Sequence, residues 1–540
     1  MQRADQTTIA IEPVLAASRS SQLSWVVPAI VFAATLAAMI AYGLYESAGR
    51  FAYPLDDTYI HMAIARTLAD SGVWGIDASE FVSGSSSMAW TMLLAIWFKI
   101  GGGDLGPLLI NIPLALATLF VCDRIARQYA VSDRVRLLTG VAIVLATPLP
   151  LLALMGMEHT LQTLAFVLFL AAGARYLERR EGWLPTLALL ALMTAVRPEG
   201  MVAAAVLVVV LFVRRDFVRG IVAAATASAP SVTFGAYSLW NGAYALPNSV
   251  LVKAGLAQPD GGAMLEMLGK ALPKLLGNGV IVGAVLVCIA VLVRKERNAR
   301  WNFALLWLGT GLLHVMLAPF GWLYRYEAYL VASAVLVIGM NIDVPLRWNR
   351  ELRSRPVARA LAYLGLAILA GEAMSRVAAA NWTGATAMRD RLYENVLSAE
   401  FVQLYYDDEA VVANDIGALA YLSHAKVLDI VGLGSNEPVA FRRDATGYDA
   451  SDVDSWARQR GARIALVKVE FEPWRTLIPK GWKRVVTWRL PRNNVFNDHL
   501  LSFYARDEAS ARQLESRMRE FAVTLPPELN LEFHRRSAVN

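Results

Sequence analysis

The chain has 540 residues, of which 56% are hydrophobic and only 18% are charged, and its mean hydropathy is +0.42. A soluble globular protein has about a quarter of its residues charged, so this composition excludes an ordinary soluble protein over most of the length. The net charge of +6 lies largely in arginine clusters between apolar runs. Because the arginines of the last third alternate with Asp and Glu, we expect no nucleic-acid partner.

Apolar runs predict a polytopic α-helical membrane module in the first 380 residues. We expect about eleven membrane-spanning helices, at 24–46, 105–121, 137–155, 160–176, 183–196, 200–213, 218–239, 278–294, 302–318, 328–342 and 357–377. Several of these runs are shorter than the roughly 20 residues that a bilayer requires. The charged turn Arg197-Pro198-Glu199 separates two of them, and it suits membrane depth only if it lines a cavity.

The charges between the runs predict the orientation of the helices. Arginine clusters alternate with loops that are nearly free of Arg and Lys, and the arginine-rich loops face the cytoplasm by the positive-inside rule. With the N-terminus in the cytoplasm, an odd number of spans places the C-terminal domain outside. The apolar run 88–100 is short, and we interpret it as an amphipathic helix on the outer surface.

The first exterior loop, residues 47–104, contains the adjacent carboxylates Asp56 and Asp57 at the predicted start of a helix. One reading is a simple helix cap, for which a single Asp is enough. The other is a functional pair that takes a proton from a hydroxyl or holds a divalent cation. A later Ser/Gly run with Ser85 and Ser86 is either a flexible turn or a source of hydroxyls for a polar ligand.

Three other exterior segments have a similar character. Glu158 and His159 adjoin one helix junction, Asn248 precedes Lys253 in an apolar stretch, and Arg325 lies between two spans. A lone cation at a helix end usually extends to lipid headgroups. Together, however, carboxylates and cations on one side suit an anionic, partly lipidic substrate, with the cations binding phosphate.

From about residue 381 the composition predicts an α/β exterior domain, 381–540. Strand-like runs occur at 410–413, 426–431, 464–469, 484–490 and 500–504, with helices near 387–405, 452–460 and 508–522. Trp474, Trp482 and Trp488 either stack on sugars or are ordinary buried aromatics. The domain either roofs a site and contacts a glycan acceptor or has no chemical role.

Several short motifs resemble those of the GT-C superfamily of bacterial glycosyltransferases, in order and spacing. The motifs are Asp56-Asp57-Thr58-Tyr59-Ile60, Glu80-Phe81 with its Ser/Gly run and Trp90, the block 156–161, and the turn 194–200. A further element, Leu246-Pro247-Asn248 followed by Lys253, resembles the branch that contains the terminal arabinofuranosyltransferases of mycobacterial cell walls. The segments 414–418 and 427–433 resemble the exterior domain of that branch.

This resemblance implies a fold, a reaction and a set of site residues. It implies a GT-C-like helical module in the bacterial cytoplasmic membrane, whose donor is a polyprenyl-phosphate sugar and whose acceptor is a glycan or lipid outside that membrane. It implies catalytic roles for Asp56, Asp57 and Glu158, with Asp56 favoured as the reactive carboxylate. Lys253 and Arg325 would hold the donor phosphate, and the substrate would contact Tyr59, His61, Ser85, Ser86, His159 and Asn248. The context of Arg325 departs from the usual pattern of the family.

A carboxylate base and a phosphate leaving group favour a single displacement with inversion at the sugar carbon. The sequence does not decide whether a metal takes part. The alternatives are a transporter or flippase for a lipid-linked substrate, which would place charges near mid-membrane, and a polysaccharide ligase. Because the candidate charges cluster at the outer ends of the spans, we favour the enzyme.

Overall fold

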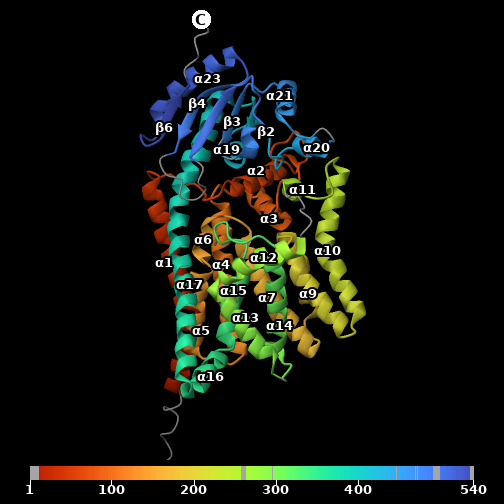
Figure 1. Ribbon diagram of the computed structural model, residues 1–540, viewed down its shortest axis with the longest axis vertical. Helices are drawn as coiled ribbons and strands as arrows, with labels where there is room; N and C mark the ends of the chain where they lie inside the picture. The colour runs from red at the N-terminus through yellow and green to blue at the C-terminus, as the bar shows by residue number, and fades with distance from the viewer. Residues whose placement is uncertain are drawn as a thin grey trace, which may run out of the picture.

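The computed structural model describes residues 11–256, 263–294, 296–444, 447–468, 470, 472–490 and 499–534. The membrane module is helical throughout (Figure 1). Its helices are α1 (Ile11–Glu46), α2 (Asp56–Ser71), α3 (Met88–Lys99), α4 (Gly106–Gln128), α5 (Asp133–Ala146), α6 (Leu149–Leu154), α7 (His159–Arg179), α8 (Trp183–Val196), α9 (Gly200–Val213), α10 (Phe217–Trp240), α11 (Asn248–Leu256), α12 (Ala263–Leu276), α13 (Gly279–Leu292), α14 (Ala299–Leu317), α15 (Ala328–Met340), α16 (Asp343–Glu351) and α17 (Pro356–Arg391).

By length and composition, five helices of the described chain are able to cross a membrane, or seven if two bent pairs each count as one span. The chain is therefore a polytopic helical membrane protein. Every apolar run of the sequence coincides with a helix, but the number eleven is not confirmed, since α8 and α9 have only 14 residues each. The run 137–155 is two helices, α5 and α6, because Pro148 lacks the N–H needed to continue a helix.

Helices α2 and α3 form a layer between the helical bundle and the C-terminal sheet (Figure 1). The run Met88–Lys99 is thus a helix, as expected, and its 12 residues are too few to cross a bilayer. The Ser87 side chain caps it by accepting a hydrogen bond from the Trp90 N–H. Of the two cavities described below, one lies at the N-terminal end of α2 and the other at its C-terminal end.

Helix α17 connects the bundle to the C-terminal domain and packs along α1 (Figure 1). Its 36 residues extend about 54 Å, and the sequence boundary expected at residue 380 falls inside it. The helix continues as a π-helical turn, Leu392–Val396, and then as α18, Leu397–Tyr406. A single π turn within a long helix is often found at a functional site.

The C-terminal domain is built on a six-stranded mixed sheet of order β2-β1-β3-β5-β4-β6. The strands are β1 (Ala410–Ala413), β2 (Lys426–Asp429), β3 (Ile464–Lys468), β4 (Lys483–Arg489), β5 (Leu500–Ala505) and β6 (Asn530–Phe533). β1 pairs in parallel with β2 and β3, and the remaining pairs are antiparallel. The continuous apolar run of β1 is typical of a strand covered on both faces.

The remaining helices of the domain are α19 (Gly417–Leu422), α20 (Glu437–Arg443), α21 (Ala450–Gln459), α22 (Glu472–Arg475) and α23 (Glu508–Phe521). The sequence predicted the first five strands, and it missed β6. Trp482 and Trp488 are buried, at 7% and 0% exposure. The Trp488 ring packs against Phe503, so these two residues are core aromatics.

Candidate active site

A polar cavity of about 250 Å³ lies at the N-terminal end of α2. Asp57 and Arg325 face each other in it, and Arg325 Nη2 donates a 2.7 Å hydrogen bond to Asp57 Oδ2. The remaining lining residues are Ile60 and His61 of α2, Trp322 and Tyr326 beside Arg325, and, from five further segments of the chain, Gly84, Ser86, Met157, Arg197, Ser249 and Leu433. The cavity thus joins a carboxylate and a guanidinium that the sequence suggested for one site.

Arg325 is only 4% exposed, although its neighbours satisfy little of its hydrogen-bonding capacity. Its Nη2 donates to Asp57 and, at 3.1 Å, to the Tyr326 hydroxyl. Its Nε and Nη1 have no hydrogen-bond partner among the described residues. Buried donors of a charged group are rarely left unpaired, so this side chain suits an anion that enters the cavity.

A left-handed turn immediately precedes Arg325. Trp322, Leu323 and Tyr324 have φ values of 47°, 60° and 62°, which cost non-glycine residues about 1–3 kcal/mol each. Glu327 stabilises the turn by accepting the Gly321 N–H at 2.9 Å, and Arg376 in turn pairs with Glu327 at 2.7 Å. This strained backbone fixes the direction of the Arg325 side chain.

The second carboxylate of the site, Glu158, is fully buried and is bound by Arg197. Arg197 Nη1 lies 2.6 Å from Glu158 Oε1, and the same guanidinium forms a two-pronged pair with Glu199 at 2.8 and 2.9 Å. Burial alone would raise the pKa of Glu158, but neighbouring groups, Arg197 among them, hold it below its usual range. Glu158 is therefore an ionised residue that orients Arg197.

Arg197 is a charged residue of the cavity that was not predicted as a site residue from the sequence. It lines the cavity, and its guanidinium lies 5.3 Å from the Tyr326 ring centroid, while that of Arg325 lies 5.0 Å from the same ring. The charged turn broken by Pro198 was the available signal. A charged turn within a membrane module is expected to line a cavity, and Arg197 does line one.

His61 connects the cavity to the Ser/Gly run of the first loop. Its Nδ1 lies 3.1 Å from Ser85 Oγ and 3.2 Å from Thr91 Oγ1, and its Nε2 lies 3.6 Å from Glu158 Oε2. Burial lowers the pKa of His61, so the ring is neutral. Ser86 also lines the cavity, whereas Ser85 lies behind His61 and supports it.

Asp56 does not face the cavity. Its two carboxylate oxygens accept the backbone N–H groups of Gly417, at 2.6 Å, and Ala418, at 2.8 Å, in the C-terminal domain. It also makes no side-chain cap for its own helix α2. Of the two adjacent aspartates, therefore, only Asp57 meets Arg325.

Three more residues expected at the site lie outside the cavity lining. Tyr59 is buried and its hydroxyl accepts the Tyr53 N–H at 3.0 Å. Asn248 is buried between the first loop and the C-terminal domain, where its Nδ2 donates to Asn436 Oδ1 at 3.2 Å. His159 Nδ1 contacts Gln162 Oε1 at 3.2 Å, and its ring meets Tyr326 edge to face.

Lys253 belongs to helix α11, but its side chain lies outside the described part of the structure. Ser249, one helical turn earlier in α11, lines the cavity. In the described residues, no three His, Cys, Asp or Glu side chains gather closely enough to hold a metal ion.

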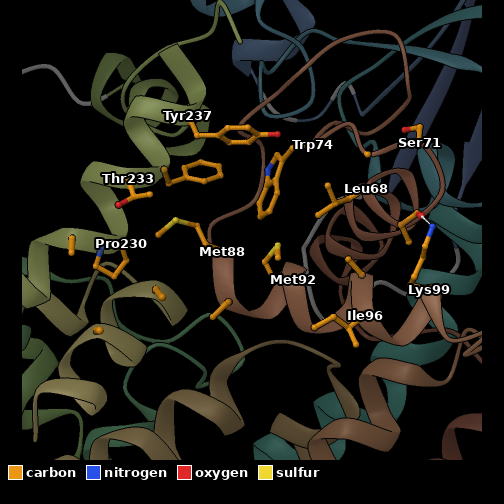
Figure 2. Close-up of a pocket in the computed structure, with 18 of the residues that line it drawn as sticks. Leu68, Ser71, Trp74, Met88, Met92, Ile96, Lys99, Pro230, Thr233 and Tyr237 are labelled. Atoms are coloured by element: carbon orange, nitrogen blue, oxygen red, sulfur yellow. Dashed lines mark hydrogen bonds between the residues drawn. The ribbon is translucent and has the colours of Figure 1, made fainter. Parts of the chain in front are cut away.

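A larger and mostly apolar cavity of about 1190 Å³ opens at the other end of α2 (Figure 2). Leu68, Trp74, Met88 and Met92 line it from the α2–α3 layer, and Thr233 and Tyr237 line it from α10. Two short stretches of the chain contribute to both cavities. Ser86 lines the polar cavity and Met88 lines the apolar one. At the end of α8, Arg197 lines the polar cavity and Ala195 lines the apolar one.

Crystal structures of ArnT from Cupriavidus metallidurans match this architecture, one bound to undecaprenyl phosphate and one in the apo state. Both matches have a TM-score of 0.52 and cover 88% of this chain and 98% of ArnT, at 13% and 14% identity. The chain has the GT-C fold. In this fold, the polar cavity lies where the segment 47–104 meets the C-terminal domain, through Leu433.

Two further GT-C structures match with lower scores. An Archaeoglobus fulgidus oligosaccharyltransferase has a TM-score of 0.44 at 11% identity, covering 88% of this chain and 74% of its own. The arabinofuranosyltransferase AftD from Mycobacteria has a TM-score of 0.39 at 14% identity, covering 88% of this chain and 41% of AftD. Both scores are too low to indicate more than a partial likeness.

A family model described as "Domain of unknown function (DUF8728)" matches residues 380–506, which is less than half of the chain. No curated protein sequence matches this chain significantly.

Proposed function

We propose that this protein is a membrane glycosyltransferase that moves a sugar from a polyprenyl-phosphate donor to a hydroxyl of a cell-envelope glycan or lipid. The observation that carries the proposal is the buried Arg325, whose Nε and Nη1 have no hydrogen-bond partner among the described residues, in one cavity with Asp57. A guanidinium recognises phosphate through such donors. A carboxylate beside it suits proton removal from an incoming hydroxyl.

In the proposed reaction, Asp57 takes the proton of the acceptor hydroxyl. The acceptor oxygen forms a bond to the anomeric carbon of the sugar, and the bond from that carbon to the phosphate oxygen breaks. The electron pair leaves on the polyprenyl phosphate, where Arg325 stabilises the added negative charge. A single displacement inverts the configuration of the anomeric carbon.

The other residues have supporting roles in this proposal. Arg197, oriented by Glu158 and Glu199, adds positive potential to the cavity. Lys253 of α11 is proposed as a second cation for the phosphate, on the sequence motif. Ser86 and His61 offer polar contacts to the sugar from the cavity wall. Tyr59, Ser85, His159 and Asn248 act indirectly, because they support the loops that shape the cavity.

The apolar cavity is assigned to the polyprenyl chain of the donor. The chain would pass from the phosphate site along Met88 and Ala195 and lie among the side chains shown in Figure 2. Burial of such a chain stabilises binding by roughly 0.8 kcal/mol per CH₂. ArnT, with the same fold, has been crystallised with undecaprenyl phosphate.

We place the protein in the bacterial cytoplasmic membrane, with eleven spans in residues 1–380 and the domain 381–540 on the outer side. The helices α5, α8, α9 and α14 would complete the eleven spans together with the five long helices and the two bent pairs. The support for the orientation is the alternation of arginine-rich loops. Arabinofuranosyl transfer is proposed on the resemblance of the Leu246-Pro247-Asn248 and Lys253 motif, and of the segments 414–418 and 427–433, to that branch.

The test is a transfer assay with purified full-length protein in detergent. Synthetic polyprenyl-phosphate sugars, both pentofuranosyl and hexosyl, are supplied with cell-envelope glycan, and release of polyprenyl phosphate is measured. We expect release with at least one donor, and none with Asp57→Ala. Release that does not depend on Asp57, or no release with any donor, would contradict the proposal.

A further inference from the structure

Asp56 and Asp57 are adjacent, yet they face different parts of the molecule. Asp57 lines the polar cavity, whereas Asp56 is 6% exposed and is held by the Gly417 and Ala418 N–H groups. These two donors come from the C-terminal domain, more than 360 residues away in the sequence. The first turn of α2 is therefore bound to the segment that follows β1, at the start of α19.

The start of α19 approaches α2 closely. A Cβ atom added to Gly417 would lie 2.1 Å from the Asp56 carbonyl oxygen and 2.8 Å from its carboxylate carbon. Neither distance is possible without movement of one backbone relative to the other. The glycine is thus required for the close approach of the two chain segments.

A buried group of charges holds Asp415, two residues before α19. Asp415 accepts a 2.7 Å hydrogen bond from Asn395 Nδ2 and forms an ion pair with Lys468 of β3. Lys468 Nζ also lies 2.5 Å from Glu394 Oε1, and Arg391 lies 2.8 Å from Glu394 Oε2. Glu394 and Asn395 belong to the π-helical turn that ends α17.

The charges favour a neutral, protonated Asp56 beside an ionised Asp415. Burial and then the charge of Asp415 raise the pKa of Asp56. For Asp415, burial alone would raise the pKa, but Lys468 and Arg391 hold it below its usual range. A protonated Asp56 can donate to Asp415 while it accepts from the two backbone N–H groups.

We infer that Asp56 is a positioning residue, through which the C-terminal domain sets the place of Asp57 in the cavity. The connection runs from the π-helical turn to Asp415, to the Gly417–Ala418 backbone, to Asp56 and so to the first turn of α2. The inference rests on the proposed function, since it explains how the proposed base is held. It assigns the C-terminal domain a direct role in the rate of sugar transfer.

A positioning role and a catalytic role predict different results for Asn and Ala. An Asn at position 56 keeps one acceptor for a backbone N–H and a donor toward Asp415, as the protonated acid does. We therefore expect Asp56→Asn to retain kcat within about threefold, and Asp56→Ala to lose about a hundredfold, as a small displacement of a reacting group can. At position 57, both Asn and Ala should lower kcat by about a hundredfold to ten-thousandfold. KM for the donor should stay within about threefold in both Asp56 variants, because Arg325 is unchanged.

Gly417→Ala provides a second variant, which changes neither carboxylate. It should lower kcat as Asp56→Ala does, although Gly417 lies outside the cavity lining. The matched control is Gly481→Ala in the same domain, since an added Cβ there meets nothing within 4 Å. Hydrogen exchange of the amides in the first turn of α2 should accelerate in Asp56→Ala and Gly417→Ala, and not in Asp56→Asn.

The outcomes separate the two proposals. If the wild type is active and Asp56→Asn is as inactive as Asp57→Asn, Asp56 is itself the base and the positioning role is wrong. If Asp56→Ala and Gly417→Ala both keep full kcat, the C-terminal domain does not determine the position of Asp57. If the wild type transfers no sugar, the proposed function fails, and unchanged amide exchange in both variants would then reject the connection itself.

Discussion

Asp57 and Arg325 are 268 residues apart in the sequence and are joined by a 2.7 Å hydrogen bond between Oδ2 and Nη2. The pair is asymmetric, because the Asp57 side chain is 43% exposed and that of Arg325 only 5%. The carboxylate can thus be reached from the cavity, while the guanidinium stays in a dry environment in which its charge acts strongly. This difference suits a base that meets substrate and a cation that holds phosphate.

Replacement of Asp57 by Asn should remove the base and keep an acceptor for Arg325. We expect kcat to fall by about a hundredfold to ten-thousandfold, as the loss of a general base usually does. Binding of undecaprenyl phosphate should change little, since Arg325 remains. Sugar transfer and lipid binding are both measured on protein whose thermal unfolding matches the wild type. A folded variant with near wild-type kcat would show that Asp57 is not the base.

Replacement of Arg325 by Lys should keep the charge and lose the planar fork of donors. We expect KM for the polyprenyl-phosphate sugar to rise about tenfold to a hundredfold, with a lower kcat because the leaving phosphate is less stabilised. The control is Arg489→Lys at the end of β4, because the Arg489 side chain is 56% exposed. Equal kinetics for the two variants would argue against a phosphate at Arg325.

A large side chain in the apolar cavity should discriminate between donors by chain length. Ala229 of α10 lines the cavity, and Trp at this position would displace several CH₂ groups of a long chain. We expect KM to rise about tenfold or more for a decaprenyl donor and to stay unchanged for a donor of two isoprene units. Ala225→Trp, at an exposed position of α10 outside this lining, is the control. A uniform effect on both donors would place the polyprenyl chain elsewhere.

Glu80 predicts a pH dependence of stability. Burial, and next the charge of Glu437, raise the pKa of Glu80 to about 7 from the usual 4.5. The folded protein therefore keeps a proton that the unfolded chain loses, and the free energy of unfolding falls as pH rises from 4.5 to 7. The melting temperature of Glu80→Gln should fall less than that of the wild type over this window. Identical pH profiles would contradict the raised pKa.

The orientation in the membrane has a direct test. A reporter that is active only in the cytoplasm, fused after Asn540, should give no signal, because the proposed orientation, based on the arginine-rich loops, has the C-terminal domain outside. The same reporter fused in the arginine-rich segment between α9 and α10 serves as the positive control. A strong signal from the C-terminal fusion would reverse the topology and move the proposed site to the cytoplasmic face.

Hydrophobic patterning was sufficient to predict most of the elements. Apolar runs coincide with helices from α1 to α17, and α8 and α9 have the predicted limits. The strand β6 was missed because it has only four residues and none of them is fully buried, so no apolar run marks it in the sequence. The number of spans could not be predicted in the same way, since several helices are shorter than a bilayer is thick.

The roles of neighbouring residues were harder to predict than the site itself. On physical grounds alone, the sequence did not distinguish Asp56 from Asp57 as the reactive carboxylate. The two differ because Asp56 accepts hydrogen bonds from the Gly417 and Ala418 N–H groups, and no local sequence pattern reveals this contact. In the sequence, Arg197 could be identified as a charged residue next to Pro198, between two apolar helices. Its pairing with Glu158 depends on how α7 and α8 pack, so its place in the site became clear only in three dimensions.

The π-helical turn Leu392–Val396 makes the C-terminal domain sensitive to chain length at one point. A π turn contains one residue more than the α-helix it interrupts, and each residue turns an α-helix by about 100°. Deletion of a single residue here would restore a regular helix, and α17 and α18 would keep their relative orientation, because the extra residue is accommodated within the turn. The residues of the turn itself would shift by about 100°, and Glu394 would turn away from Lys468. A one-residue deletion, which most loops tolerate, would therefore break the buried ion pairs that this turn makes with the sheet.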